Sequence, residues 1–389
     1  FGNGRGWRAG RFSGCLFPII NVKLQLGIAA PFVYRGTVNG ADFRRQAIAA
    51  APEHRFEAAA FFLQPGFQVA AFAAHALLAQ HFEFVAETRR RKAQAAAQKY
   101  GVPFATDNAA ELAARSDVDL LVVAVNLPQH QALLEQILPS SKAVYCEWPL
   151  GTDPDQSRHL AALAAQYGCR NFIGLQALHS PYINKIKQLL DDPATGRMLA
   201  CTIQGSDPSR ARTSLSRYRY AQFQENGVNT LTIPFAHLLS ALRFLFGSLN
   251  QMHALTACQY AEILLQDTGE TVHRTATDHV FFHARTAQGG LIDAAYGGSL
   301  EGLKISIECE HARITITAAN GHIQYQPLTI EIARSNGSRE TFAPHTEAQE
   351  NLVGAYRAVY RDLTEGTHTV PDFAAAAEHQ QILFDLQQP

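Results

Sequence analysis

The chain has 389 residues, of which 47% are hydrophobic and 17% charged, and its formal net charge is −1. This balance excludes a collagen, a coiled coil and a wholly disordered chain, and at roughly 100–200 residues per domain it suggests two or three domains. The near-neutral charge gives no electrostatic reason to expect nucleic acid or an anionic membrane as a partner. The sequence contains no run of about 18 apolar residues without a charge, so we expect no membrane-spanning helix.

The cysteines and the first segment of the chain suggest a compartment but no activity. Six cysteines lie far apart, without a CxxC pair or a paired Cys/His spacing, so we expect neither a disulfide framework nor a metal site. Because no disulfide pattern is present, we expect a reducing, cytoplasmic location. Residues 1–54 begin with a Gly/Arg-rich stretch that has no acidic residue up to Gly14. We interpret 1–54 as an N-terminal extension of unclear role, with an organelle presequence as the alternative.

From Arg55 onward, strand patterns alternate with helix patterns. Val118–Val125 (VDLLVVAV) is nearly continuous in Val and Leu, which is typical of a buried parallel strand. Alternation of this kind predicts a Rossmann-type, doubly wound parallel sheet over residues 55–172. The other expected strands are Phe56–Leu63, Phe82–Ala86, Ala143–Cys146 and Asn171–Leu175, and the expected helices are Val69–Gln80, Arg91–Tyr100, Gln129–Leu138 and Pro154–Tyr167.

The pattern changes near residue 173. Ser180–Leu190 predicts an amphipathic helix that Ser180 caps. Short β-type runs with little helix between them then predict an antiparallel sheet. The expected fold is therefore α/β, with the N-terminal doubly wound domain followed by an α+β domain, residues 173–389, built on a large open, mostly antiparallel sheet. The β-type runs are Leu199–Gln204, His279–Ala284, Leu291–Tyr296, Lys304–Glu310 and Arg313–Thr317.

The first strand-to-helix turn of a doubly wound sheet cradles a pyrophosphate with backbone N–H groups. Here the turn spans residues 63–68 and holds one glycine, Gly66, in place of the G-x-G-x-x-G pattern. Gly66 either allows a phosphate to approach closely or is an ordinary turn glycine, and the sequence leaves both readings open.

The residues after the second strand bear on the choice of dinucleotide. An acidic residue there suits the ribose hydroxyls of NAD, whereas arginine suits the 2′-phosphate of NADP. This chain has Glu87, Thr88 and then four consecutive cations that begin with Arg89 and Arg90. The cations favour NADP slightly over NAD, Glu87 keeps NAD open, and a solvated helix start is the structural alternative.

Three stretches resemble the Gfo/Idh/MocA oxidoreductase family: residues 118–138, 143–168 and 350–373. Within that family, four marks are similar to the branch that includes the galactose-pathway corepressor. The resemblance covers roughly Arg55 to Leu386, and it implies a Rossmann domain followed by an open sheet that often forms a dimer interface. The four marks are Glu147-Trp148-Pro149, Gly174-Leu175-Gln176 with Ser180-Pro181-Tyr182, Gly227-Val228-Asn229 leading to His237, and Thr277-Asp278-His279.

The resemblance also implies a nicotinamide cofactor, NADP or NAD, between the two domains. It places residues of this chain at the pyrophosphate turn, at the adenosine ribose, along the cofactor after the fourth strand, and near the nicotinamide after the fifth. In that order these are Gly66 and Phe67; Thr88, Arg89 and Arg90; Asn126, Leu127, Pro128 and His130; and Glu147 and Trp148.

Hydride transfer from an alcohol needs a base for the hydroxyl proton and a group that stabilises the oxyanion. Family members typically use a Lys in E-K-P and an Asp in D-x-x-x-H, but Trp148 and Ile233 occupy those positions here. His237 remains, either as the catalytic acid–base or as a core histidine at the start of the predicted helix Leu238–Phe246. His179 is the second catalytic candidate.

Asp278 and His279 also suggest a carboxylate–histidine pair. Since adjacent strand residues point to opposite faces, we expect that they do not act as a dyad.

Two functions therefore compete. The first is an NAD(P)-dependent oxidoreductase that acts on a sugar or polyol-like alcohol. The second is a non-catalytic NAD(P)-binding regulatory protein that resembles the corepressor and has lost the usual Lys and Asp. In either case we expect a homodimer through the C-terminal sheet, no metal, and neither direct nucleic-acid binding nor a membrane partner.

Overall fold

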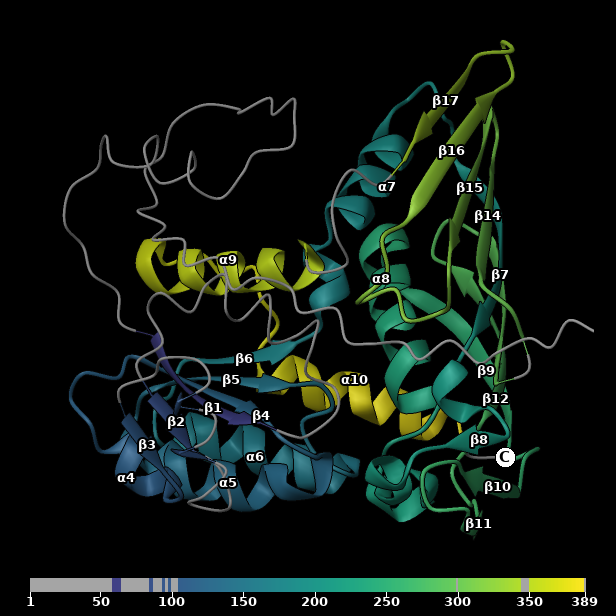
Figure 1. The fold of residues 1–389 in the computed structure, drawn as a ribbon. Coiled ribbons are helices and arrows are strands. Elements are labelled where there is room, and N and C mark those ends of the chain that lie inside the picture. Colours follow the sequence, from purple (N-terminus) through teal and green to yellow (C-terminus); the bar gives the residue numbers. More distant parts are fainter. Residues whose placement is uncertain are drawn as a thin grey trace, which may run out of the picture. The chain divides into compact units, whose positions relative to one another are not determined.

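The computed structural model describes residues 58–63, 84–86, 93–94, 97–98, 104–298, 300–343 and 350–387, which all belong to one compact unit (Figure 1). The N-terminal extension, the predicted helix Val69–Gln80 and the turn at residues 64–68 lie outside the described residues. The same holds for Gly66, Phe67, Thr88, Arg89 and Arg90, so their predicted roles stay predictions.

Six parallel strands form the first sheet in the order β3-β2-β1-β4-β5-β6, which confirms the predicted doubly wound domain. Strand β4 (Leu120–Ala124) lies at the centre and is buried over most of its length, and for this reason its sequence does not alternate. The other strands are β1 (Ala58–Leu63), β2 (Phe84–Ala86), β3 (Phe104–Thr106), β5 (Ala143–Glu147) and β6 (Asn171–Gly174).

Helices α4 (Ala109–Ala113), α5 (His130–Ile137) and α6 (Pro154–Gln166) cover one face of this sheet (Figure 1). The first residue of α6 is Pro154, and the carboxylate of Asp153 caps the helix by accepting the Gln156 N–H at 2.8 Å. Residues 93–94 and 97–98, inside the predicted helix Arg91–Tyr100, are also helical.

Helix α9 (Glu350–Glu365), from the far end of the chain, covers the other face of the parallel sheet (Figure 1). Its Leu352 and Tyr356 pack against Leu120, Val122 and Tyr145 of the sheet. Helix α10 (Phe373–Asp385) lies against α6. The parallel sheet is therefore completed by helices from residues 350–385, far beyond residue 172.

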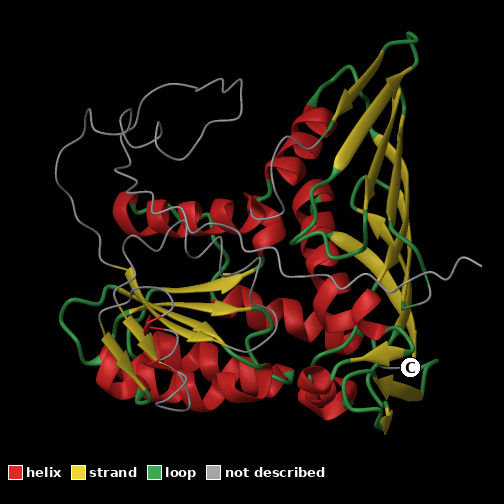
Figure 2. Ribbon diagram, in the orientation of Figure 1, coloured by secondary structure: helices red, strands yellow, loops and turns green. Residues whose placement is uncertain are grey.

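Eight strands form the second sheet, in the order β17-β16-β15-β14-β7-β13-β12-β9 (Figure 1). Figure 2 shows this sheet in yellow, with helices in red along one of its faces. Every neighbouring pair is antiparallel except β7 with β13, which confirms the predicted open, mostly antiparallel sheet. The bounds are β7 (Met198–Ser206), β9 (Leu249–Ala257), β12 (His279–Thr286), β13 (Leu291–Gly297), β14 (Leu303–Cys309), β15 (Ala312–Ala318), β16 (Thr329–Arg334) and β17 (Arg339–Phe342). A small third sheet joins β8 (Thr213–Ser214), β10 (Glu262–Leu265) and β11 (Thr271–His273).

The helices of the second region pack on one face of the eight-stranded sheet. Helix α7 (Pro181–Asp191) has the predicted cap, because the Ser180 hydroxyl accepts the Tyr182 N–H at 3.2 Å. A π-turn, η8 (Leu231–Phe235), runs directly into α8 (Ala236–Phe246), and Phe235 packs edge-on against Phe282 of β12 with ring centroids 5.1 Å apart. The short turns are η2 (Leu127–Gln129), η3 (Leu138–Ser140), η4 (Gln176–His179), η5 (Pro208–Arg210), η6 (Ser216–Gln222) and η7 (Gln224–Asn226).

Within the described part of the chain, Gln224–Phe246 is long and apolar enough to cross a membrane by length and composition. However, 72% of its apolar window is buried inside the protein, as expected for a core helix.

Candidate functional site

The carboxyl ends of β4 and β5 lie side by side, with Val123 paired to Cys146. A doubly wound sheet binds its ligand at this edge. Asn126 and Leu127 follow β4, and the Oδ1 atom of Asn126 is buried without a hydrogen-bond partner in the described part of the chain. Such an orphaned acceptor fits a donor group on a bound dinucleotide, for example a ribose hydroxyl. Pro128, one residue further on, is exposed.

The side chain of His130 does not line this edge, in contrast to the prediction. Its ring is buried, with Nδ1 3.3 Å from the Leu150 carbonyl and Nε2 3.2 Å from the Val125 carbonyl. Burial lowers the pKa of the imidazole, although these backbone contacts oppose the shift. His130 therefore connects the loops after β4 and β5 and can affect a cofactor only through them.

Trp148 is fixed inside the protein. Its indole N–H donates to the Thr232 carbonyl at 2.7 Å, its ring lies 5.0 Å from the His379 ring, and it is 6% exposed. Trp148, which replaces the family's lysine, is therefore buried between the loop after β5 and η8. Its indole N–H, the only donor of the side chain, is already in use.

His237 lies in the first turn of α8, is 3% exposed, and its Nδ1 has no partner in the described part of the chain. Burial, together with His322 and His379, lowers its pKa to about 3. A general base works best with a pKa near the working pH. These properties favour the core-histidine interpretation over the catalytic one.

Helix α8, which carries His237, packs against η4, which carries His179. His179 ends η4 and lies against α9, where a Cβ built on Gly354 would come within 2.3 Å of the His179 carbonyl oxygen. Burial lowers the pKa of His179 to about 4, which Asp362 opposes and Arg361 reinforces. Within the described ranges, no hydrogen bond or ring contact joins His179 to His237 or Trp148.

Glu147 ends β5 and occupies a polar setting. Strand alternation places it on the same face as Tyr145, toward α9, because Tyr145 packs with Tyr356 of that helix at 5.0 Å between ring centroids. Its Oε2 accepts the Gln176 amide N–H at 2.5 Å. Burial raises the pKa of the Glu147 carboxyl to about 7, against the lowering effect of the Gln176 bond.

Three tyrosines come close to Glu147: Tyr145 and Tyr356, which are buried, and Tyr325, which is half-buried. The pKa of each phenol is raised first by burial and then by the negative charge of Glu147. We call this set the tyrosine–glutamate cluster: Tyr145, Glu147, Gln176, Tyr325 and Tyr356. From sequence, Glu147 was expected only as a cofactor contact, and nothing in the local pattern indicates that Tyr325 and Tyr356 meet it.

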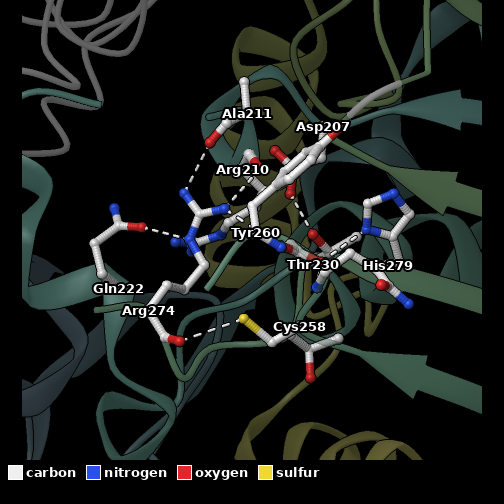
Figure 3. A network of polar contacts seen from close by, with 12 residues as sticks. Asp207, Arg210, Ala211, Gln222, Thr230, Cys258, Tyr260, Arg274 and His279 are labelled. Carbon is white, nitrogen blue, oxygen red and sulfur yellow. Dashed lines mark hydrogen bonds and ion pairs between the residues drawn. The ribbon is translucent and has the colours of Figure 1, made fainter. Parts of the chain in front are cut away.

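A second polar network, built around Arg274, lies at the start of β12 (Figure 3). The fully buried guanidinium of Arg274 donates to the Gln222 side chain at 2.9 Å and to the carbonyls of Arg210 and Ala211 at 2.8 and 3.0 Å. Arg210 in turn donates to the Val228 carbonyl at 2.9 Å. Since its donors go largely to backbone carbonyls, this network holds the loop between β7 and η8 in place.

Asp278 and His279 are in contact, although strand alternation was expected to separate them; that they do not act as a catalytic dyad stays a prediction. Asp278 Oδ1 lies 2.7 Å from His279 Nδ1, and its carboxylate also accepts the N–H groups of Gln259 and Tyr260. Strand alternation does not apply because β12 begins at His279, so Asp278 still belongs to the preceding turn. Asp278 has structural partners on all sides, including Arg274 at 3.4 Å.

The part of the chain that the structure describes offers no candidate metal site. Within it, no group of three His, Cys, Asp or Glu side chains is arranged to hold a metal ion. The cysteines placed by the structure are free thiols: Cys146, Cys169, Cys201, Cys258 and Cys309.

Fold and site together define a dinucleotide-binding protein with a second, sheet-based region. Residues 59–175 match the family model described as oxidoreductase family, NAD-binding Rossmann fold. Residues 181–326 match the model of the Gal80p C-terminal domain. The chain belongs to the Gfo/Idh/MocA oxidoreductase family, in a branch resembling Gal80, as its sequence motifs indicated.

Curated relatives include dehydrogenases and regulators. The dehydrogenase aclE of Aspergillus oryzae is 32% identical over 179 residues, which is 46% of this chain and 49% of that protein. The galactose/lactose metabolism regulatory protein GAL80 of Kluyveromyces lactis is 27% identical over 217 residues, 52% of this chain and 44% of that protein. The chain thus spans about half the length of these two relatives. An inositol 2-dehydrogenase of Rhizobium meliloti is 25% identical over 281 residues, 70% of this chain and 79% of that protein.

Solved structures share the fold. A super-repressor mutant of Gal80p from Saccharomyces cerevisiae superposes with a TM-score of 0.77 at 17% identity, covering 85% of this chain and 95% of that one. Levoglucosan dehydrogenase in complex with NADH and L-sorbose gives a TM-score of 0.71 at 16% identity, covering 85% and 95%.

Proposed function

We propose that this protein is an NAD(P)-dependent oxidoreductase that transfers hydride to or from a sugar or polyol-like alcohol. The observation that supports this most strongly is the tyrosine–glutamate cluster. It presents a carboxyl group with a pKa of about 7 at the end of β5, beside the edge where a doubly wound sheet binds its dinucleotide. The dehydrogenases among the relatives support the same reaction class.

The cofactor, when bound, supplies the hydride donor or acceptor. Asn126 offers it a free acceptor atom, and Leu127 and Pro128 form the adjoining loop. We propose that NADP is preferred over NAD because Arg89 and Arg90 follow β2, where a 2′-phosphate would lie.

Calorimetry with both cofactors tests this preference. Arg89→Ala should weaken NADP far more than NAD, whereas Arg158→Ala, on the exposed side of α6, should change neither. Equal losses for both cofactors in Arg89→Ala would contradict the phosphate assignment.

The reaction itself is tested with the full chain on a panel of polyols and aldoses, followed at the nicotinamide absorbance. We expect slow turnover of at least one member. A protein that binds dinucleotide tightly and turns over nothing on a broad panel would instead support the second candidate function.

That second candidate is a non-catalytic NAD(P)-binding regulator. The engaged indole N–H of Trp148 and the low pKa of His237 favour it, since neither side chain is suited to carry the substrate proton. On this reading the dinucleotide acts as a ligand that alters binding to a partner protein. The expected result is partner binding that changes with dinucleotide in the absence of any turnover.

We further propose that the protein forms a homodimer through the outer face of the eight-stranded sheet. Leu255 on β9 and Phe281 on β12 are cross-strand neighbours there, 79% and 58% exposed, and clustered exposed apolar side chains mark association surfaces. Sedimentation should show a dimer that Phe281→Glu converts to a monomer. The control Arg158→Glu, on the exposed side of α6, should leave the dimer intact, and a monomeric wild type would contradict the proposal.

The cytoplasmic location, the absence of a nucleic-acid or membrane partner and the dispensability of residues 1–54 remain predictions. Deleting 1–54 and measuring dinucleotide affinity tests the last of these.

A further inference from the structure

Four buried side-chain oxygens from different elements have no hydrogen-bond partner among the described residues. Buried polar atoms are almost always paired, so each unpaired one calls for an explanation such as a ligand or water. They come from β5, η4, the turn after β15 and the first turn of α9. These oxygens are Tyr145 OH, Gln176 Oε1, Gln324 Oε1 and Asn351 Oδ1.

Gly174, the last residue of β6, shows that three polar groups lie close together. A Cβ built on Gly174 would lie 2.8 Å from Tyr145 OH, 3.0 Å from Glu147 Oε2 and 3.1 Å from Gln176 Nε2. A hydroxyl, an amide and a carboxylate therefore converge against the backbone of Gly174, and even one added methyl group would crowd them.

The other two unpaired oxygens belong to the turn after β15 and to the start of α9, and the Gln324 amide nitrogen lies 3.3 Å from His322 Nδ1. The Asn351 amide donates to the Ile323 carbonyl at 2.9 Å, which joins the start of α9 to the turn that carries Gln324 and Tyr325. Tyr325 is near enough to Glu147 for the carboxylate charge to raise its pKa.

We propose that Glu147 is the catalytic residue that takes the proton of the substrate hydroxyl, and that Tyr145 and Gln176 bind that hydroxyl beside it. This inference rests on the proposed oxidoreductase function. Glu147 Oε2 is held by Gln176, whereas Oε1 accepts no hydrogen bond from a described residue and is therefore the oxygen that meets the substrate.

The step balances in both directions. Oxidation of the alcohol breaks its C–H and O–H bonds and forms a C=O bond. The hydride leaves the carbon for the oxidised dinucleotide, and the proton leaves the oxygen for Glu147 Oε1. In the reducing direction the protonated carboxyl returns the proton to the new alkoxide.

The electrostatics agree with this role. Near neutral pH a group with a pKa of about 7 is present in both protonation states, so Glu147 can give and take a proton. His237, with a pKa of about 3, is a far weaker base.

The central experiment compares Glu147→Gln with wild type, because glutamine keeps the size of the side chain and removes its proton chemistry. We expect turnover to fall by about 10²–10⁴-fold while dinucleotide affinity stays within about twofold. Glu365→Gln, an exposed control at the end of α9, should match wild type. Turnover that survives in Glu147→Gln, or that is lost in His237→Ala with Glu147 intact, would overturn the assignment.

Two readouts do not depend on turnover. Infrared difference spectroscopy should show one carboxylic-acid band that titrates near pH 7 and disappears in Glu147→Gln. Calorimetry with xylitol on the NADPH-bound protein should show binding that Gly174→Ala weakens at least tenfold without loss of NADPH affinity, because the new methyl group would push Tyr145 OH and Glu147 Oε2 out of their positions. A Glu147 that titrates in the ordinary carboxyl range, or xylitol binding unchanged in Gly174→Ala, would overturn the inference.

Failure of the inference and failure of the proposed function give different results. A wild type that binds neither dinucleotide contradicts the oxidoreductase function itself. If it binds dinucleotide but neither turns over a substrate nor binds xylitol, the oxidoreductase proposal yields to the regulator and the role of Glu147 falls with it.

Discussion

Two regions meet at the end of β5, one residue apart in the sequence. Around Trp148 and His237 the side chains are buried, the one indole donor is satisfied, and the imidazole is held neutral although its Nδ1 has no partner among the described residues. Around Glu147, toward α9, polar atoms outnumber their partners and a carboxyl holds its proton up to about pH 7. The comparison teaches that a protein can lack the usual Lys and Asp of its family's motifs and still have polar groups at the end of β5. Here those groups lie on the opposite side of the strand end, around Glu147.

Placing a charge in the buried region around Trp148 should have the largest effect on the free energy of unfolding. Trp148→Lys restores the usual family residue but buries an ammonium group where Trp148 contacts Thr232 and His379. We expect the free energy of unfolding to fall by about 3–5 kcal/mol, with no gain in turnover. Urea denaturation measures it. Trp148→Phe, which only leaves the Thr232 carbonyl unpaired, should cost about 1–3 kcal/mol. A stable, faster Trp148→Lys would show that the two regions are not distinct.

The pH dependence of stability should reveal Glu147. Its folded pKa of about 7 exceeds the ordinary 4.5, so between these values the folded chain binds more protons than the unfolded chain, and stability falls as pH rises through that window. Relative to Glu147→Gln, wild type should therefore be less stable by about 2–3 kcal/mol at pH 8 and equally stable at pH 4. Denaturation curves across this range test the sign; a difference that does not vary with pH would place Glu147 in ordinary solvent.

Pushing α9 away from η4 should destabilise the tyrosine–glutamate cluster and leave the packing around Trp148 unchanged. Gly354→Ala puts a methyl group against the His179 carbonyl, 2.3 Å away. We expect a net loss of about 1–3 kcal/mol despite the better helix propensity of alanine. Gly168→Ala, with φ of +64° and no atom within 4 Å of the added Cβ, isolates backbone strain from the clash. Gly168→Ala should lower the free energy of unfolding by about 1 kcal/mol. A Gly354→Ala variant as stable as wild type would mean that α9 does not pack this tightly against η4.

The smallest effect concerns His237 at acid pH. Its folded pKa of about 3 lies below the ordinary 6.5, so below pH 6.5 the unfolded chain takes up a proton that the folded chain refuses, and stability is lost as pH falls. His237→Leu should regain about 1–2 kcal/mol at pH 5 relative to its effect at pH 8. The exposed His368→Leu serves as the control. An equal effect at both pH values would show that His237 ionises freely.

Local signals predicted much of the fold. The Ser180 cap and helical periodicity gave α7 to within one residue at each end, and the apolar run at 118–125 gave β4. What escaped prediction depends on contacts between distant segments. The meeting of Tyr325 and Tyr356 at Glu147 requires residues about 180 and 210 positions apart to converge. The pairing of Asp278 with His279 escaped for another reason, since it depends on where the strand starts, and strand boundaries are poorly defined by composition.

The return of α9 to the parallel sheet has a consequence for biosynthesis. Translation proceeds from the N-terminus, so β4 and β5 leave the ribosome more than 200 residues before the helix that covers them. Until then one apolar side of the nascent domain is bare and open to chaperones. A stop codon anywhere before residue 350 leaves that surface permanently uncovered, so even a late truncation should yield a product that is cleared by proteolysis instead of a shortened working protein.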